Sequence, residues 1–381
     1  MLPGLPPRKG AFGSSPLSEC AISTCLSGAE LYVLYSCNDN SDLGAGSFLK
    51  KVDLNSLDGN LQDQPNIYSS EVTTAGPRIL HKSNEALVIC GAMPEVIGLD
   101  GVSRLYSEAE GLLNIDWKPS GWLHYREGRV YRGYGYHVPE MGVDVINADT
   151  RSIVQHLDLD IRYSGPWQGD FMCGQRSNGR FAVYSLNEQR YLFELSLESC
   201  RFRSPEKRVN ASTCVDGRAY VLAGDTLLLI DIASGQLLRE IRYLQLEALQ
   251  AHMQAEKLRY EHACASLISV CDSGVVLTLS TVYGYALYLD LSLDDPYVWF
   301  WSEGRSVVAR NCPGDLIYGQ SNDLPMAWDK YSGEVVWRST RPVATNTIQV
   351  GDQWLVYSQL AGFIECFHWK KTYISPHRPQ A

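Results

Sequence analysis

Two stretches of this sequence decide the fold: Leu227-Leu-Leu-Ile-Asp231-Ile-Ala-Ser-Gly235-Gln-Leu-Leu238 and Pro325-Met-Ala-Trp-Asp329-Lys-Tyr-Ser-Gly333-Glu-Val-Val-Trp337. Each contains an apolar run, an aspartate, a short turn that ends in glycine, and a second apolar run. The aspartate side chain can cap the backbone two residues on, and glycine supplies the positive φ of a tight hairpin turn. The phrase therefore predicts two antiparallel strands joined by a short turn.

Weaker copies of this phrase centre on acidic or amide residues elsewhere in the chain, namely Asp53, Asp100, Asn147, Glu194 and Asp290, with a degenerate copy near Cys366. The gaps between successive anchors are 47, 47, 47, 37, 59, 39 and about 37 residues, a recurring unit of roughly 40–50 that is typical of propeller blades with four short strands. The sequence therefore predicts an all-β fold, a β-propeller of four-stranded antiparallel blades, eight by count with seven as the alternative. A β-sandwich pair or a solenoid is the other all-β interpretation.

Two of the expected blades are needed below. The fourth, anchored at Glu194, is expected to contain strands at Phe171–Gly174, Phe181–Ser185, Arg190–Leu195 and Cys200–Arg203. The eighth is expected to contain Thr345–Val350, Trp354–Gln359, Phe363–His368 and Thr372–Ser375. In both blades the β-branched and aromatic residues of these runs favour a pleated, half-buried surface.

The chain is expected to have one propeller domain over residues 19–381, preceded by an irregular N-terminal arm over residues 1–18, which are rich in Pro, Gly and Ser. One segment breaks the strand pattern: residues 243–262 are rich in helix formers, with Leu246, Leu249 and Met253 on one stripe. The segment predicts an inserted helix, which serves either as a lid packed on the ring or as a partner-binding element.

The composition is acidic, with a formal net charge of −10. Such a surface repels phosphate, so nucleic acid and anionic membrane are poor partners and a basic protein is the natural one. The 11 cysteines form no C-x-x-C motif and mostly lie in apolar runs, which indicates buried thiols in a reducing compartment. The N-terminus lacks the apolar core of a signal peptide, and no apolar run is long enough to span a membrane. We expect a cytoplasmic protein.

The turns at Asp231 and Asp329 resemble the repeat of quinoprotein-type (PQQ-like) propellers and, more broadly, of WD40-like propellers. In the quinoprotein-type family an apolar or aromatic residue, Asp, two further residues, Ser or Thr, Gly and a later Trp close the outer hairpin of each blade. The resemblance implies the fold. It carries no cofactor site, because no vicinal Cys pair and no ordered set of Trp and carboxylate ligands matches, so we expect no cofactor.

The sequence contains no nucleophile elbow, no phosphate-binding loop and no zinc motif. The acidic run Asn38–Asp42 lacks the glycine and distal glutamate of a calcium loop, which favours a solvated turn. The histidines are scattered and the pair Asp294 and Asp295 fits a hairpin turn. We therefore expect no catalytic residue and no metal site.

The loops that join the second strand to the third, and one blade to the next, share one face of a propeller. Aromatic and acidic residues gather in these loops, and aromatic anchors surrounded by acids suit a basic protein partner. The candidate partner-binding residues are Asp39, Asp42, Glu108, Glu110, Tyr134, Tyr136, His137, Glu140, Trp167, Asp170 and Asp323. The alternative is that the aromatic residues pack between blades and the acids are simply solvated.

The sequence thus predicts a non-enzymatic, protein-binding propeller, monomeric on its own. The chain is acidic, lacks a signal peptide pattern and has eroded repeats. In these respects it resembles the immunity proteins that neutralise bacterial secreted toxins, such as those of type VI secretion. That resemblance implies a basic, cytoplasm-acting toxin, possibly a nuclease, as the partner. The alternatives are a propeller hydrolase or lyase with carboxylates at the central channel, and a scaffold or assembly module.

Overall fold

The structure is a computed structural model that describes residues 8–13, 20–37, 46–56, 64–70, 79–82, 86–90, 95–98, 103–105, 123–134, 142–147, 149–150, 152–161, 170–200, 209–257, 265–279, 284–303, 306–308, 311–312, 314–340, 347–351, 353–358, 363–368 and 373–378. The chain divides into two compact units. The N-terminal unit comprises Gly4–Leu159 and Val343–Lys371, and the C-terminal unit comprises Asp160–Pro342 and Thr372–Ala381.

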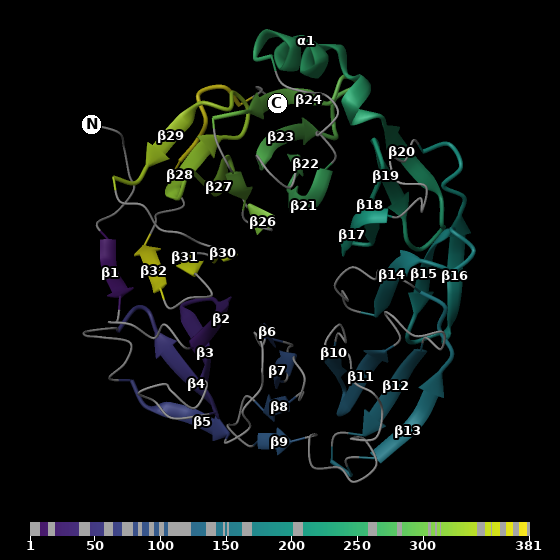
Figure 1. Ribbon diagram of the computed structural model, residues 1–381, viewed down its shortest axis with the longest axis vertical. Coiled ribbons are helices and arrows are strands. Elements are labelled where there is room, and N and C mark those ends of the chain that lie inside the picture. The colour runs from purple at the N-terminus through teal and green to yellow at the C-terminus, as the bar shows by residue number, and fades with distance from the viewer. Residues whose placement is uncertain are drawn as a thin grey trace. The chain divides into compact units, whose positions relative to one another are not determined.

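Three sheets of the N-terminal unit are four-stranded, and in each the strands pair antiparallel in the order of the chain (Figure 1). This is the arrangement predicted for a propeller blade. The strands are β2 (Cys20–Ser27), β3 (Glu30–Cys37), β4 (Gly46–Asp53) and β5 (Asn66–Ser70); β6 (Ile79–Lys82), β7 (Ala86–Cys90), β8 (Glu95–Gly98) and β9 (Ser103–Leu105); and β10 (Leu123–Arg126), β11 (Arg129–Tyr134), β12 (Gly142–Asn147) and β13 (Ser152–Leu157).

The fourth sheet of the N-terminal unit combines an N-terminal strand with three C-terminal ones, in the order β1 (Arg8–Gly13), β32 (Phe363–His368), β31 (Trp354–Ser358) and β30 (Thr347–Val350). The irregular arm predicted over residues 1–18 is therefore wrong for Arg8–Gly13. The predicted eighth blade is wrong in its fourth strand, because β1 takes that place. Backbone groups along the open edge of β32 need partners whatever the local propensity of the segment that supplies them.

The C-terminal unit also contains four sheets. Its strands are β14 (Phe171–Gln175), β15 (Phe181–Ser185) and β16 (Arg190–Leu195); β17 (Val209–Val215), β18 (Arg218–Ala223), β19 (Thr226–Asp231) and β20 (Leu237–Ile241); β21 (Ala265–Cys271), β22 (Gly274–Leu279), β23 (Tyr285–Asp290) and β24 (Tyr297–Trp301), with β26 (Asn311–Cys312) added parallel to β21; and β25 (Ser306–Val308), β27 (Leu316–Ser321), β28 (Leu324–Asp329) and β29 (Val335–Arg338).

The β14–β16 sheet has three described strands, and one backbone hydrogen bond shows which positions in a four-stranded blade they occupy. In the β17–β20 sheet the amide of Ile232, just after the third strand, donates to the carbonyl of Gly217, just before the second, at 2.9 Å. In the same way the amide of Leu186, after β15, donates to the carbonyl of Asp170, before β14, at 2.9 Å. β14, β15 and β16 therefore correspond to the second, third and fourth strands of a blade.

The sequence interpretation of this blade is wrong by one strand. Its expected anchor, Glu194, lies within β16, and the structural equivalent of Asp231 is Ser185. The Ser185 hydroxyl accepts a hydrogen bond from the amide of Glu188 at 3.2 Å, as the carboxylate does in the clearer copies. Gln189, with φ of 50°, stands where those copies have glycine. The phrase is hidden because its aspartate, the following serine and the glycine are replaced by Ser185, Glu188 and Gln189.

The inserted segment forms a 3-10 turn, Tyr243–Gln245, and helix α1, Glu247–Ala255. Figure 1 shows α1 beside β24, and Leu249 and Met253 are buried in one apolar cluster with Phe300 of that strand. The helix predicted over residues 243–262 is thus confirmed for residues 247–255, while residues 258–262 lie outside the described residues. Its apolar stripe packs on the C-terminal unit, as expected of a lid.

The glycines of the two clearest turns serve conformation and packing at once. Gly235 and Gly333 have φ of 68° and 73°. A Cβ atom at Gly235 would lie 2.8 Å from the Cβ of Phe193 on β16, and one at Gly333 would lie 2.8 Å from the Cβ of Trp299 on β24. Each turn therefore packs against the fourth strand of the preceding sheet, at a distance that only glycine permits.

The part of the chain that the structure describes thus contains eight sheets, four in each unit. Within each sheet neighbouring strands pair antiparallel, except that β26 pairs parallel with β21. The architecture is all-β, with mostly four-stranded antiparallel blades and one α-helix among the described residues. The number of blades that close into one ring, and the single domain over residues 19–381, stay predictions, because the two units are described separately.

Candidate interaction surfaces

Most of the predicted partner-binding residues fall outside the described part of the chain. These are Asp39, Asp42, Glu108, Glu110, Tyr136, His137, Glu140 and Trp167. Tyr134 ends β11, and only its backbone is described. Asp170 and Asp323 are described, and they belong to different sheets of the C-terminal unit. The predicted binding face therefore stays a prediction.

Asp170 has a local structural role. Its Oδ2 atom accepts a hydrogen bond from the Asn187 side-chain amide at 2.8 Å, and its carbonyl accepts the amide of Leu186 at 2.9 Å. Both donors lie in the turn between β15 and β16. Asp170 thus holds this turn against the start of β14.

Asp323 lies in the two-residue turn between β27 and β28 and is exposed. Asn322 and Asp323 both have positive φ, 49° and 61°. Two consecutive residues of this conformation form a hairpin turn whose twist matches its strands, and Asn and Asp tolerate it better than most residues. The turn conformation thus accounts for an aspartate at position 323.

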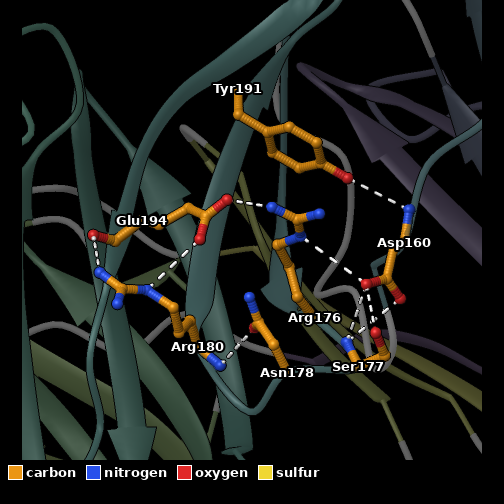
Figure 2. Close-up of polar contacts among 7 residues, drawn as sticks. All are labelled: Asp160, Arg176, Ser177, Asn178, Arg180, Tyr191 and Glu194. Carbon is orange, nitrogen blue, oxygen red and sulfur yellow. Dashed lines mark hydrogen bonds and ion pairs between the residues drawn. The ribbon is translucent and has the colours of Figure 1, made fainter.

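A polar cluster on the β14–β16 sheet was not predicted from the sequence (Figure 2). Arg176 and Arg180 flank the turn between β14 and β15, and both contact Glu194 on β16. Arg176 Nη1 donates to Glu194 Oε1, and Arg180 Nε lies 3.3 Å from Glu194 Oε2. The Arg176 guanidinium also lies over the ring of Tyr191, 4.4 Å from its centroid. The sequence feature that could have indicated this cluster is the pair of arginines on either side of Asn178-Gly179.

Asp160 brings the preceding chain segment to this cluster (Figure 2). Its carboxylate accepts the amide of Ser177 at 3.1 Å, and its own amide donates to the Tyr191 hydroxyl at 3.1 Å. Burial raises the pKa of Tyr191, and the nearby Arg176 charge offsets only part of that rise. Because the two arginines face two carboxylates, the cluster is balanced in charge and acts as a structural tie.

A second polar site lies where the C-terminal segment Tyr373–Arg378, here named the clasp, contacts the β25–β29 sheet. The Tyr373 hydroxyl donates to Oδ2 of Asp329 at 2.6 Å. The other oxygen, Oδ1, accepts the backbone amides of Tyr331 and Ser332, each at 2.9 Å. Asp329 is only 1% exposed. One carboxylate oxygen thus holds the turn and the other holds the clasp.

Asp315, between β26 and β27, binds the far end of the clasp. Its Oδ2 accepts the amide of Ser375 at 3.1 Å and lies 3.9 Å from Arg378 Nη1, while its Oδ1 accepts the Tyr331 hydroxyl at 3.3 Å. Asp315 is 8% exposed. Asp315 and Asp329, here named the clasp site, therefore recognise a hydroxyl, a backbone amide and a guanidinium.

The pKa values at the clasp site reflect these contacts. Burial alone would raise the pKa of Asp329, but side-chain hydrogen bonds from Ser375 and Tyr373 and the turn amides outweigh it, so the pKa lies below its ordinary value. Burial, together with the Asp329 carboxylate, raises the pKa of Tyr373. The carboxylate is therefore the charged partner and the phenol the neutral donor near neutral pH.

The described residues contain no group of three or more His, Cys, Asp or Glu side chains placed to hold a metal ion. No helix among them is long and apolar enough to cross a membrane.

No protein-family model and no curated protein matches the sequence. The structure is similar to that of the computationally designed Ika8 protein, with a TM-score of 0.59 and 12% identity over 93% of this chain and 98% of Ika8. It is similar to BamB from Moraxella catarrhalis, with a TM-score of 0.60 and 10% identity over 97% and 99%. It is also similar to Saccharomyces cerevisiae Sqt1, with a TM-score of 0.60 and 12% identity over 92% and 96%. At these identities the likeness is one of fold: the chain is an all-β propeller of mostly four-stranded antiparallel blades.

Proposed function

We propose that this chain is a non-enzymatic propeller that binds a basic protein. The carrying observation is an apolar patch on the outer edge of the β17–β20 sheet. Leu237 and Leu238 are 38% and 46% exposed on β20. Arg239 donates to the carbonyls of Leu291 and Leu293 at 2.6 and 2.5 Å, which brings the exposed Leu293 beside that strand. Adjacent exposed apolar side chains mark interaction surfaces more often than isolated ones do. Leu237, Leu238 and Leu293 are here named the rim patch.

The sharper form of the proposal is an immunity or inhibitor protein that neutralises a basic, cytoplasm-acting bacterial toxin, possibly a nuclease. Its support is the net charge of −10, which steers a basic partner toward the chain. Cytoplasmic location is proposed on the cysteines: seven with described side chains are thiols, six of them buried. Buried thiols that pack as small apolar groups suit a reducing compartment.

Surface plasmon resonance against the product of the neighbouring gene, across a salt series, tests the proposal. We expect the association rate to fall as salt rises, because charge steering is screened. Leu238→Asp should speed dissociation at least about tenfold, as loss of a buried apolar anchor does. The matched control is Ile67→Asp. Both residues are exposed and lie at a β-bulge, because the pairing of β19 with β20 passes over Leu238 and the pairing of β4 with β5 passes over Ile67. Equal effects of both variants would remove the rim patch, and no association would remove the inhibitor proposal.

A further inference from the structure

The clasp site is occupied by the chain's own segment Tyr373–Arg378. We propose that Asp315 and Asp329 also accept an extended segment of the basic protein partner, one that presents a tyrosine, a backbone amide two residues on and an arginine. The partner's segment displaces the clasp. The inference rests on the proposed function, because it supplies the site and the chemistry by which a protein partner is recognised.

The first argument is that the site is formed by the sheet and not by the clasp. Asp329 Oδ1 is fixed by the amides of Tyr331 and Ser332, and the Asp315 carbonyl accepts the amide of Lys330 at 2.9 Å. The equivalent turn at Asp231 forms the same amide bond, from Ser234 at 2.8 Å, although its carboxylate bonds no other segment among the described residues. The two acceptor oxygens that face the clasp are therefore held in place when the clasp leaves.

The second argument is that the clasp is held by a few polar contacts. It joins no sheet among the described residues. Among the described residues, its contacts with the clasp site are the Tyr373 and Ser375 hydroxyls on Asp329, the Ser375 amide on Asp315 and the more distant Arg378 guanidinium. Ile374, the apolar side chain between Tyr373 and Ser375, is 73% exposed. A segment with the same donors replaces these contacts one for one.

The third argument concerns charge. The clasp site presents two carboxylates, and the cations near them are Lys330, whose Nζ bonds the Gly314 carbonyl at 3.4 Å, and Arg378. Glu334 adds an acid beside the clasp, 3.6 Å from His377 Nε2. A segment with lysine or arginine in the place of His377 gives Glu334 a partner that is always charged near neutral pH. The site therefore favours a basic segment over a neutral or acidic one.

The test uses the full-length chain and a synthetic peptide of residues 372–381 with an N-terminal fluorophore, followed by anisotropy. The wild-type clasp competes with the peptide at a high effective concentration. Tyr373→Phe weakens the clasp and leaves the site intact, so peptide affinity should rise about fivefold, as expected for one lost hydrogen bond. Asp315→Asn damages the site and should lower peptide affinity about tenfold. Arg338→Ala, which removes an exposed pair with Glu303, is the control and should change nothing.

These opposite changes are the signature of the proposal. Tyr373→Phe that leaves peptide affinity unchanged or lowers it would overturn the displacement. If Asp315→Asn fails to fold, a peptide with Phe in place of its Tyr replaces it, and equal binding of the two peptides to the wild-type chain would overturn recognition. If the neighbouring gene's product loses binding only to the Leu238→Asp variant and not to Asp315→Asn, recognition of the partner at the clasp site would also be overturned. Failure of the neighbouring gene's product to bind, with the peptide pattern intact, removes the proposed function and leaves the site.

Discussion

The turns at Asp231 and Asp329 are two copies of one sequence phrase that differ in what covers them. In both, Oδ1 of the aspartate accepts the amide three residues on, from Ser234 at 2.8 Å and from Ser332 at 2.9 Å. Asp329 lies buried beneath the clasp, whereas Asp231 is partly exposed and its carboxylate hydrogen-bonds, among the described residues, only within its own turn. The phrase itself is thus sufficient for the turn.

The difference teaches that a repeated structural residue can gain a second role where another segment reaches it. The free oxygen of the turn aspartate is surplus to the turn at Asp231 and becomes the acceptor for Tyr373 at Asp329. No feature of the local sequence marks which copy has this role. The variants that follow separate what the two turns share from what only one of them has.

The largest effect is expected from the two turn glycines. Gly235→Ala and Gly333→Ala should each cost about 2–4 kcal/mol, because the new methyl group meets Phe193 or Trp299 and the backbone keeps a positive φ. Gly217→Ala is the control: its φ is 72° and nothing lies within 4 Å of its Cβ position, so about 1 kcal/mol is expected. Urea unfolding measures all three. Equal losses would show that φ alone matters.

Removal of the turn carboxylates should separate the two copies. Asp329→Ala loses the turn amides and Tyr373 together and should cost about 2–3 kcal/mol of unfolding free energy. Asp231→Ala should cost less, because its carboxylate is solvated. Tyr373→Phe should account for part of the difference. Guanidinium unfolding of the three variants measures it, and equal losses for both aspartates would mean that the clasp contributes nothing.

The eroded turn at Ser185 offers a smaller test of the same phrase. Gln189 has φ of 50° in the position of Gly235, a conformation that costs a non-glycine residue about 1 kcal/mol. Gln189→Gly should therefore be more stable than Gln189→Ala by about 1 kcal/mol. Both variants lack the glutamine side chain, so the difference between them reports the cost of a positive φ at this position. A more stable alanine variant in thermal unfolding would contradict the assigned equivalence.

The smallest effect is a difference in acid sensitivity. The pKa of Asp329 is lowered in the folded chain, so its charge stabilises the fold above the unfolded value of about 4, and this contribution is lost as pH falls through the folded value. The melting temperature of the wild-type chain should fall below about pH 4 more steeply than that of Asp329→Asn. Melting curves between about pH 5 and pH 2 measure it. Parallel curves would mean that Asp329 is not the charged partner.

The propeller fold could be predicted from the sequence because the turn phrase depends on local chemistry. An aspartate, a small residue and a glycine favour this turn by themselves, as at Asp231 and Asp329. The prediction failed at Ser185, where a hydroxyl and a glutamine perform the same roles. It also failed at Arg8–Gly13, whose strand is set by the edge of β32 and not by its own residues.

The polar sites could not be predicted, because their partners are brought together by packing. Tyr373 and Asp329, or Asp160 and Ser177, are far apart in the chain, and neither pair forms a motif. The predicted acids that are described, Asp170 and Asp323, are explained by their turns. Charge and composition predict the kind of partner, whereas the position of a surface depends on tertiary contacts.

The most direct measurement is amide hydrogen exchange along the clasp of the full-length chain. The Ser375 amide donates to Asp315 and Ser375 is 5% exposed, whereas the side chain of its neighbour Ile374 is open to solvent. We predict that the Ser375 amide is protected and that the peptide of residues 372–381, added in excess, abolishes this protection. Exchange of Ser375 at the rate of an unstructured peptide, or protection that the peptide leaves unchanged, would contradict a displaceable clasp on Asp315 and Asp329.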